Sequence, residues 1–311
     1  HNIMDMISLD EKSEIKAQLS SVSDPFTVIV PCYNELQALP DAIVELERIL
    51  VTFGPHELIV IDDGSTDGTS AALRSLQEHH PEITILKHET NQGYGASLKT
   101  GVRHAKYDSI VITDADGTYP NDRIGDLLAF IKDYDMVVGS RTGENVEYST
   151  LRKIPKYFLK HYASWIAGRN IPDLNSGLRV FKRNLAEKFL SVLPDGFSFT
   201  TTITMAHLTN KYSVHYEPIN YSRRIGKSKI QPVRDTLRFL QLIIRLGVYF
   251  APLKVFGPFA AIQVVAFMIS VTYDVFILQN ITDKTIMLLM FSMNTTFFAL
   301  LADMIDKRSQ N

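Results

Sequence analysis

Short apolar runs alternate with longer amphipathic stretches over residues 26–220, and a polar, glycine-rich segment follows nearly every apolar run. Runs of three or four aliphatic residues, many of them β-branched, suit strands that are buried on both faces of a sheet. The expected strands contain residues 28–30, 58–61, 83–87, 110–112, 136–141 and 180–181, and the expected helices cover 39–51, 69–78, a stretch ending near 105, and 124–131. This alternation predicts an α/β domain with an open, mostly parallel sheet.

The polar segments all follow the strands, so they are expected to meet at the edge formed by the strand carboxyl ends. In open α/β sheets a ligand is held in a crevice above that edge. The first strand is not followed by the G-x-G-x-x-G pattern of dinucleotide-binding domains, and Gly93-x-Gly95 alone is a weak signal. A dinucleotide-dependent oxidoreductase is therefore poorly supported.

Asp114 and Asp116 stand directly after the expected strand 110–112, in the sequence Thr113-Asp-Ala-Asp-Gly117. Two carboxylates so close to a buried strand end repel each other unless water or a cation reaches both. Mg2+ or Mn2+ held by a few protein oxygens and completed by substrate phosphates would resolve this repulsion. An acidic turn open to solvent is the alternative that these two residues alone leave.

The last quarter of the chain, from residue 230, is much more apolar than the rest. Residues 230–250 place Arg234, Arg238 and Arg245 on one helical stripe and aliphatic residues on the opposite one, which predicts a helix lying in a membrane interface. Residues 255–273 carry no charge over roughly 28 Å of helix, about one hydrocarbon thickness. Residues 285–302 form a second uncharged run, so the two spans are expected to form a hairpin.

Basic residues flank the outer ends of this expected hairpin, whereas the connecting segment carries only Lys284 beside Asp283. The positive-inside rule then places both chain ends of the hairpin, and the α/β domain, on the cytoplasmic side. The lone cysteine, Cys32, excludes an internal disulfide and fits a reducing compartment. A net charge of -2 gives no indication of a nucleic-acid partner.

Several motifs together resemble the family-2 inverting glycosyltransferases of GT-A (Rossmann-like) fold, and their order and spacing match over roughly residues 25–230. These motifs are Val30-Pro-Cys-Tyr-Asn-Glu35, Ile61-Asp-Asp-Gly-Ser-Thr-Asp-Gly-Thr69, Asn91-x-Gly-x-Gly-Ala96, Asp114-Ala-Asp116 and Val138-Gly-Ser-Arg141. Two further motifs are similar to the polyprenyl-phosphate branch, which includes dolichyl-phosphate mannose or glucose synthases and bactoprenol glucosyltransferases. They are Asp173-x-Asn-Ser-Gly-Leu-Arg179 and Tyr221-x-Arg-Arg-x-Gly-Lys-Ser-Lys229.

The resemblance implies roles for the strand-end loops. It implies a nucleotide-sugar site bordered by Pro31, Tyr33, Glu35, Asp62, Asp63, Asn91, Gly93 and Asp114, with Gly95 allowing close backbone approach. It also implies that Asp116, assisted by Asp114, holds a divalent metal on the diphosphate. Thr118 stands where some relatives carry an amide, which leaves a third protein ligand without support.

Basic residues near the second half of the domain are candidate clamps for phosphate, because guanidinium groups bind phosphate in a bidentate manner. The expected phosphate- and acceptor-binding residues are Arg141, Arg152, Ser176, Arg179, Arg223, Arg224, Lys227 and Lys229. Arg141 and Asp173 are also expected beside Asp116 as catalytic residues, Asp173 as an orienting group or auxiliary base. The segment from Asp173 to Ser176 equally fits a simple turn, and residues 197–204 fit either an acceptor wall or core packing. His207 and His215 are expected to be structural.

The expected function is transfer of one sugar from a nucleotide diphosphate sugar, UDP-glucose favoured, to polyprenyl phosphate. The alternatives are a glycosyltransferase for another membrane acceptor or a polysaccharide, and a catalytically silent membrane scaffold. By analogy with relatives, the chain is also expected to form a homo-oligomer through the hairpin. The expected organisation is an N-terminal extension (1–24), a GT-A domain (25–229), an interfacial helix (230–250) and a transmembrane hairpin (251–311) with spans near 255–277 and 285–303 and a short cytoplasmic tail.

Overall fold

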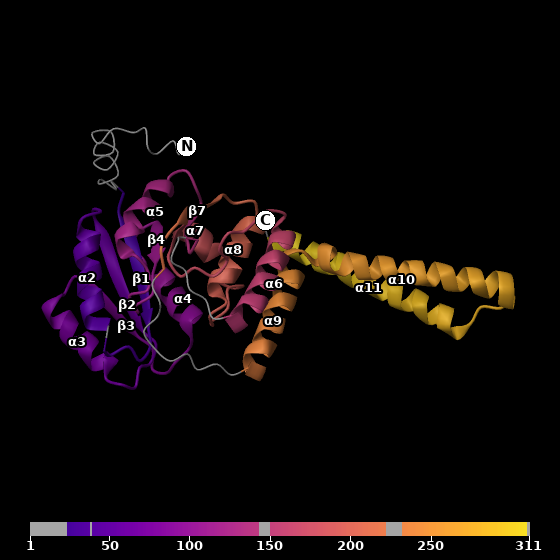
Figure 1. Cartoon of the computed structure of the whole chain (residues 1–311), viewed down its shortest axis with the longest axis horizontal. Coiled ribbons are helices and arrows are strands. Elements are labelled where there is room, and N and C mark those ends of the chain that lie inside the picture. The colour runs from indigo at the N-terminus through magenta and orange to yellow at the C-terminus, as the bar shows by residue number, and fades with distance from the viewer. Residues whose placement is uncertain (1–23, 38, 143–149, 222–231, 310–311) are drawn as a thin grey trace. The chain divides into compact units, whose positions relative to one another are not determined.

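The computed structural model describes residues 24–37, 39–142, 150–221 and 232–309 (Figure 1). Residues 1–23 of the N-terminal extension and the whole basic run at 223–229 lie outside these ranges. Internal contacts divide the chain into two compact units. The first contains residues up to Lys153 together with Ile171–Ser228, and the second contains Ile154–Asn170 together with Lys229–Asn311.

A seven-stranded sheet forms the centre of the first unit, with strand order β3-β2-β1-β4-β6-β5-β7. All neighbouring pairs are parallel except those of β6, which runs antiparallel to both β4 and β5. The strands are β1 (Phe26–Cys32), β2 (His56–Asp62), β3 (Ile83–Lys87), β4 (Ser109–Ile112), β5 (Met136–Ser140), β6 (Arg179–Lys182) and β7 (Val214–Pro218). The expectation of a mostly parallel α/β sheet is confirmed.

Helices cover both faces of this sheet (Figure 1). They are α2 (Leu39–Val51), α3 (Thr69–His79), α4 (Tyr94–His104), α5 (Ile124–Phe130), α7 (Arg183–Phe189) and α8 (Phe199–Thr209), with a 3-10 turn at Asn121–Arg123. The expected helix boundaries are confirmed to within one or two residues. Helix α3 begins directly after Gly68, which has a positive φ of 98°. The first amide of this helix, Thr69 N, donates to the carboxylate of Asp67 at 3.0 Å.

Strand β1 contains a proline, Pro31, and continues past it to Cys32, which pairs with Asp62. Ile29 O accepts from Thr113 N, whereas Cys32 O accepts from Asp63 N on the opposite side. Since backbone groups alternate in direction along a strand, Pro31 faces the side on which β4 has already ended at Ile112. The missing N–H of this proline therefore costs the sheet no hydrogen bond.

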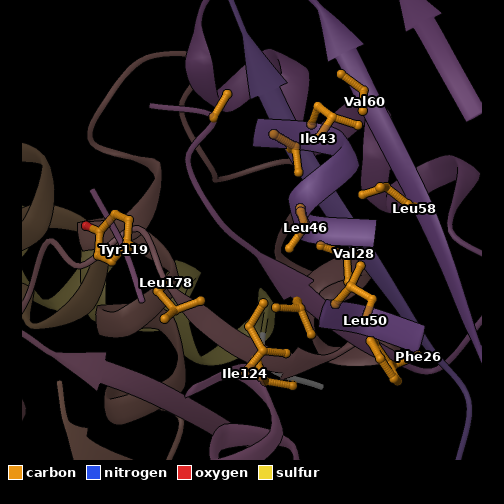
Figure 2. Close-up of a cluster of buried hydrophobic side chains, with 14 of the residues drawn as sticks. Phe26, Val28, Ile43, Leu46, Leu50, Leu58, Val60, Tyr119, Ile124 and Leu178 are labelled. Atoms are coloured by element: carbon orange, nitrogen blue, oxygen red, sulfur yellow. The ribbon is translucent and has the colours of Figure 1, made fainter. Parts of the chain in front are cut away.

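The apolar side chains of β1 point alternately to the two faces of the sheet. Phe26, Val28 and Val30 belong to one buried cluster with Leu46 and Leu50 of α2. Figure 2 labels Phe26, Val28, Leu46 and Leu50 of this cluster. On the other face, Ile29 contacts α4 so closely that a Cβ added at Gly101 would lie 2.5 Å from its Cγ2 atom. This contact sets the distance between α4 and the sheet.

The second unit contains most of α6 (Thr150–Ala167), together with α9 (Pro232–Phe250), α10 (Pro252–Tyr273), a π-helical turn (Asp274–Leu278) and α11 (Asp283–Ser309). Pro252–Leu278 and Asp283–Ile305 are, by length and composition, long and apolar enough to cross a membrane. The two helices lie side by side as a hairpin (Figure 1).

Polar side chains close the turn of this hairpin. Asp274 accepts hydrogen bonds from the amide and hydroxyl of Thr282, at 2.7 and 2.6 Å, and from Thr285 Oγ1 at 2.7 Å. Ser270 and Thr285 share a hydrogen bond between the two helices. At the other end, Lys254 Nζ donates to Ile166 O at 2.9 Å and so satisfies a terminal carbonyl of α6. The first set of contacts joins α10 to α11 at the hairpin turn, and the contact of Lys254 joins the start of α10 to the end of α6.

The contact between Gly101 and Ile29 generates a stability prediction. Gly101→Ala inserts a methyl group against the branched core side chain, and overpacking of this kind costs about 1–3 kcal/mol. We expect a lower midpoint of thermal unfolding for the detergent-purified protein. Gly196→Ala is the control, because a Cβ there meets no atom within 4 Å. Equal midpoints for the two variants would contradict the tight contact.

Candidate active site

Two consecutive aspartates close β2, and each is bonded to a different loop. Asp62 accepts from Ser65 N at 3.0 Å and from Ser70 Oγ, so it organises the loop that follows its own strand. Asp63 accepts from His88 Nδ1 at 2.7 Å and from the amides of Gln92 and Gly93, both at 2.8 Å. Asp63 therefore anchors the loop between β3 and α4.

Gly93, at the end of that loop, and Gly95, in the first turn of α4, pack against a segment distant in sequence. A Cβ at Gly93 would lie 2.4 Å from Asp195 O, and one at Gly95 would lie 2.1 Å from Pro194 O. Ala96 N also donates to Asp195 O at 3.0 Å. The packing of α4 against the 194–196 backbone thus explains both glycines, while their expected approach to a nucleotide, with Asn91, stays a prediction.

The loop after β1 is joined to the loop after β2. Asn34 has a positive φ of 56°. Its Oδ1 atom accepts a hydrogen bond from Thr66 N at 2.8 Å, and its backbone amide donates to Ser65 Oγ at 2.9 Å. Glu35 N donates to Thr69 Oγ1 at 3.1 Å. The neighbouring residue Tyr33 is 43% exposed. A side chain that stacks on a nucleobase must be exposed in this way.

The loop after β4 carries the two aspartates expected at a metal. Asp114 Oδ1 accepts from Tyr94 Oη at 3.0 Å, and Asp116 Oδ1 accepts from the amide and hydroxyl of Thr118, at 3.2 and 2.6 Å. Thr118 is buried and bonded to Asp116, so its hydroxyl supports this carboxylate. Both aspartates are only partly buried.

Arg141 and Asp173 form a buried, bidentate ion pair. The guanidinium donates from Nε at 2.7 Å and from Nη2 at 2.9 Å, and the Arg141 amide adds a third bond at 3.0 Å. The Arg141 side chain also lies over the ring of Tyr221, 5.3 Å from its centroid. Because Arg141 occupies both oxygens, the contacts favour Asp173 as an orienting group over a base.

The segment from Ser176 to Arg179 joins this pair to Asp114. A Cβ at Gly177 would lie 2.8 Å from Asp114 Oδ2, and Gly177 N donates to Tyr119 Oη at 2.7 Å. The ring of Tyr119 meets that of Tyr221 edge-on. A chain of contacts through Gly177, Tyr119 and Tyr221 therefore connects Asp114 to the Arg141–Asp173 pair.

Arg179 was expected to contact acceptor phosphate, but its side chain is fully buried. It donates to Ser176 O, to Thr200 O at 3.1 Å and to Thr204 Oγ1 at 2.8 Å. Through these contacts Arg179 has a structural role, because it holds the 173–179 segment against α8. Ser176 is likewise buried, so neither side chain reaches an acceptor in this structure.

Residues 199–204 fulfil the core-packing alternative, because all of them are buried in α8. Phe197 is instead 81% exposed and stacks on Tyr94, with ring centroids 5.7 Å apart. His207 Nδ1 donates to Ile203 O within the same helix at 2.8 Å, and burial lowers the pKa of His207 to about 4. His215 packs between the rings of Phe130 and Tyr134. Both histidines are structural, as expected.

Tyr94 and Tyr119 are functional candidates that sequence reasoning missed. Burial, with the nearby Asp114 charge, raises the pKa of Tyr94, and burial raises that of Tyr119. Both therefore remain hydroxyl groups at neutral pH. Their positions inside the Gly93-x-Gly95 segment and directly after Asp116-Gly-Thr118 were the available signal.

Several expected site residues fall outside the described structure. Arg223, Arg224, Lys227 and Lys229 lie in the segment 222–231, and the side chain of Arg152 in α6 is not described. Their expected contact with phosphate stays a prediction.

Comparison with known proteins identifies the chain. The sequence model described as glycosyl transferase family 2 matches residues 27–190. The chain belongs to this family. Among curated relatives, it is 28% identical over 211 residues to undecaprenyl-phosphate mannosyltransferase of Micrococcus luteus, covering 65% of this chain and 86% of that protein. It is 31% identical to polyprenol monophosphomannose synthase of Mycolicibacterium smegmatis, covering 65% and 80%.

A third relative is dolichyl-phosphate beta-glucosyltransferase of Dictyostelium discoideum, at 27% identity over 71% of this chain and 73% of that one. Among solved structures, glucosyl-3-phosphoglycerate synthase of Mycobacterium tuberculosis, in complex with Mn2+, UDP-glucose and phosphoglyceric acid, superimposes with a TM-score of 0.55. It shares 15% identity and covers 77% of this chain and 82% of its own. At that identity the likeness shows the GT-A fold alone.

The carboxylates of Asp114 and Asp116 are suitable ligands for a hard divalent ion. Asp114 and Asp116 would be its protein ligands, and across the described ranges of the chain no three His, Cys, Asp or Glu side chains gather as a metal site. Mg2+ and Mn2+ accept such a sparse set, since substrate phosphates and water complete the shell. Space is present beside the pair, because a Cβ at Gly117 would meet no atom within 4 Å.

The buried ion pair generates the second prediction. Asp173→Asn leaves Arg141 buried without its carboxylate, a change that costs about 3–5 kcal/mol for buried pairs. We expect a clear drop in the midpoint of thermal unfolding. Asp195→Asn is the matched control, because Asp195 is exposed and its pair with Lys99 is worth at most about 1 kcal/mol. Similar midpoints for both variants would contradict a structural role for Asp173.

Proposed function

We propose that this family 2 enzyme transfers one hexose from a nucleoside diphosphate sugar to the phosphate of a polyprenyl lipid, with inversion at the anomeric carbon. The observation that carries the proposal is the joint occurrence of a GT-A domain and an apolar helical hairpin in one chain. The named relatives support it, since they act with undecaprenyl, polyprenol or dolichyl phosphate. UDP-glucose is the favoured donor because the motifs resemble the bactoprenol branch.

The proposed acceptor explains why a strong general base is unnecessary. A phosphate monoester has its second pKa near ~6 and is therefore mostly dianionic at neutral pH. The nucleophile carries its charge before it reaches the sugar. Asp173, held by Arg141, then serves to orient the acceptor side of the site.

The principal task of the protein is to hold two anions in line across the anomeric carbon. Asp114 and Asp116 would bind the divalent ion, which when bound stabilises the charge of the departing diphosphate. Tyr94 orients Asp114, and Thr118 orients Asp116. Arg223, Arg224, Lys227 and Lys229 are the proposed phosphate contacts on the acceptor side.

We further propose that the hairpin anchors the enzyme in a membrane, with the catalytic domain on the cytoplasmic face and α9 in the interface. The outer ends of the hairpin are rich in Lys and Arg, which favours that orientation. Nucleotide sugars would then reach the domain from the cytosol, and the lipid phosphate would reach it from the bilayer.

The test of the proposed function is incubation of the purified protein with polyprenyl phosphate and a panel of UDP- and GDP-sugars in the presence of Mg2+ or Mn2+. We expect one lipid-linked hexose, identified by mass, and loss of product on chelation of the metal. Transfer only to a polysaccharide or to another lipid would favour the other glycosyltransferase alternative. Absence of both transfer and nucleotide-sugar binding would favour a silent scaffold.

Asp116→Ala provides the third prediction. Removing this ligand is expected to lower kcat at least about a hundredfold, because leaving-group stabilisation of this kind contributes several kcal/mol. The measurement is sugar transfer at saturating donor with a titration of Mn2+. Asp122→Ala removes a nearby exposed carboxylate and is expected to behave as wild type. Near-normal turnover of the Asp116 variant would refute the assigned role.

A further inference from the structure

His88 is a buried histidine that none of the motifs includes. It follows β3 directly and is 8% exposed. Its Nδ1 atom lies 2.7 Å from Asp63 Oδ1, and its Nε2 atom lies 2.9 Å from Thr100 Oγ1 in α4. An ionised carboxylate only accepts hydrogen bonds, so Nδ1 is the donor in the contact with Asp63. The ring therefore joins the end of β2 to α4.

The partner of His88 is the carboxylate that fixes the next loop. Asp63, 3% exposed, also accepts from the amides of Gln92 and Gly93. Oδ1 is shared by His88 and Gln92, and Oδ2 serves Gly93. Rotation of the carboxylate would break all three bonds, so the donation from His88 selects the single orientation that presents acceptors to both amides.

The backbone around this network leaves it little freedom. His88 N donates to Asp62 O at 2.9 Å, and Asp63 N donates to Cys32 O at 2.9 Å, so the ends of β1, β2 and β3 are fixed. A Cβ at Gly64 would lie 2.6 Å from the backbone carbon of Thr90. The two loops are thus in direct backbone contact, and a shift of Asp63 is transmitted to residues 91–93.

We propose that His88 is a positioning residue of the donor site, which holds Asp63 and, through it, the loop at Asn91–Gly93 in the conformation that receives the nucleotide. This inference rests on the proposed function, in which Asp63 and that loop border the nucleotide sugar. His88 lies behind Asp63 and acts through it, so its loss changes donor binding more than the chemical step.

Three substitutions separate the contacts of the ring. His88→Asn keeps an amide donor close to the position of Nδ1 and so preserves the bond to Asp63. His88→Gln keeps a polar group near Nε2, toward Thr100, and loses the donor at Nδ1. His88→Ala removes both. His104→Ala is the matched control, since His104 is an exposed histidine of α4 that bonds only to the carbonyl of Thr100.

The experiment measures KM for the donor and kcat for each purified full-length variant, together with UDP binding by calorimetry and the thermal midpoint. Loss of a hydrogen bond to a buried carboxylate corresponds to about a tenfold effect. We expect His88→Ala and His88→Gln to raise the donor KM and the UDP dissociation constant about tenfold, with kcat within about twofold of wild type. His88→Asn and His104→Ala are expected to stay within about threefold of wild type.

Each other outcome overturns the inference. Equal donor KM for wild type and His88→Gln shows that the Nδ1 donor does not matter. Equal impairment of His88→Asn and His88→Gln shows that only the ring shape matters, and this comparison remains decisive if His88→Ala fails to fold. A wild-type protein that neither binds UDP nor transfers sugar overturns the proposed function as well, whereas an active wild type with unaffected His88 variants overturns the inference alone.

Discussion

Carboxylates gathered at one edge of a sheet repel one another, and the architecture of this domain depends on the donors that each one receives. Asp63 receives a histidine ring and two amides, and Asp173 receives a guanidinium in bidentate contact. In both cases the donors come from another segment of the chain. Neutralising the carboxylates therefore also fixes the loops that surround the site.

The same constraint separates the two kinds of aspartate in the domain. Asp62, Asp63 and Asp173 are buried and bonded to neighbouring loops, so they shape the site. Asp114 and Asp116 are only partly buried and receive hydroxyl and amide donors from Tyr94 and Thr118. That difference is what a site for a divalent ion and a diphosphate requires, since its ligands must be oriented and still open to the substrate.

The sequence was sufficient for most of the strands and for helices α2 to α5, because these elements follow from local patterns. The bounds of β3 agree with expectation, whereas β7, α7 and α8 were not among the expected elements. Contacts between residues distant in sequence were not predictable in this way. Nothing in the spacing of His88 links it to Asp63, and Arg179 resembles a phosphate ligand until its burial beneath α8 is seen. The glycines at 93 and 95 were expected to face a nucleotide, and the structure gives them a partner in Asp195 and Pro194.

The central claim is that Asp114 and Asp116 hold the diphosphate end of a nucleotide sugar while Asp63 and its loop border the nucleoside. An experimental structure of the full chain with Mn2+ and a non-transferable UDP-sugar analogue tests this claim most directly. The account predicts a metal bound by one or both of these aspartates and by the diphosphate, with the bond between His88 and Asp63 intact. A nucleotide bound away from the carboxyl ends of β1, β2 and β4, or a metal held by other residues, would contradict it.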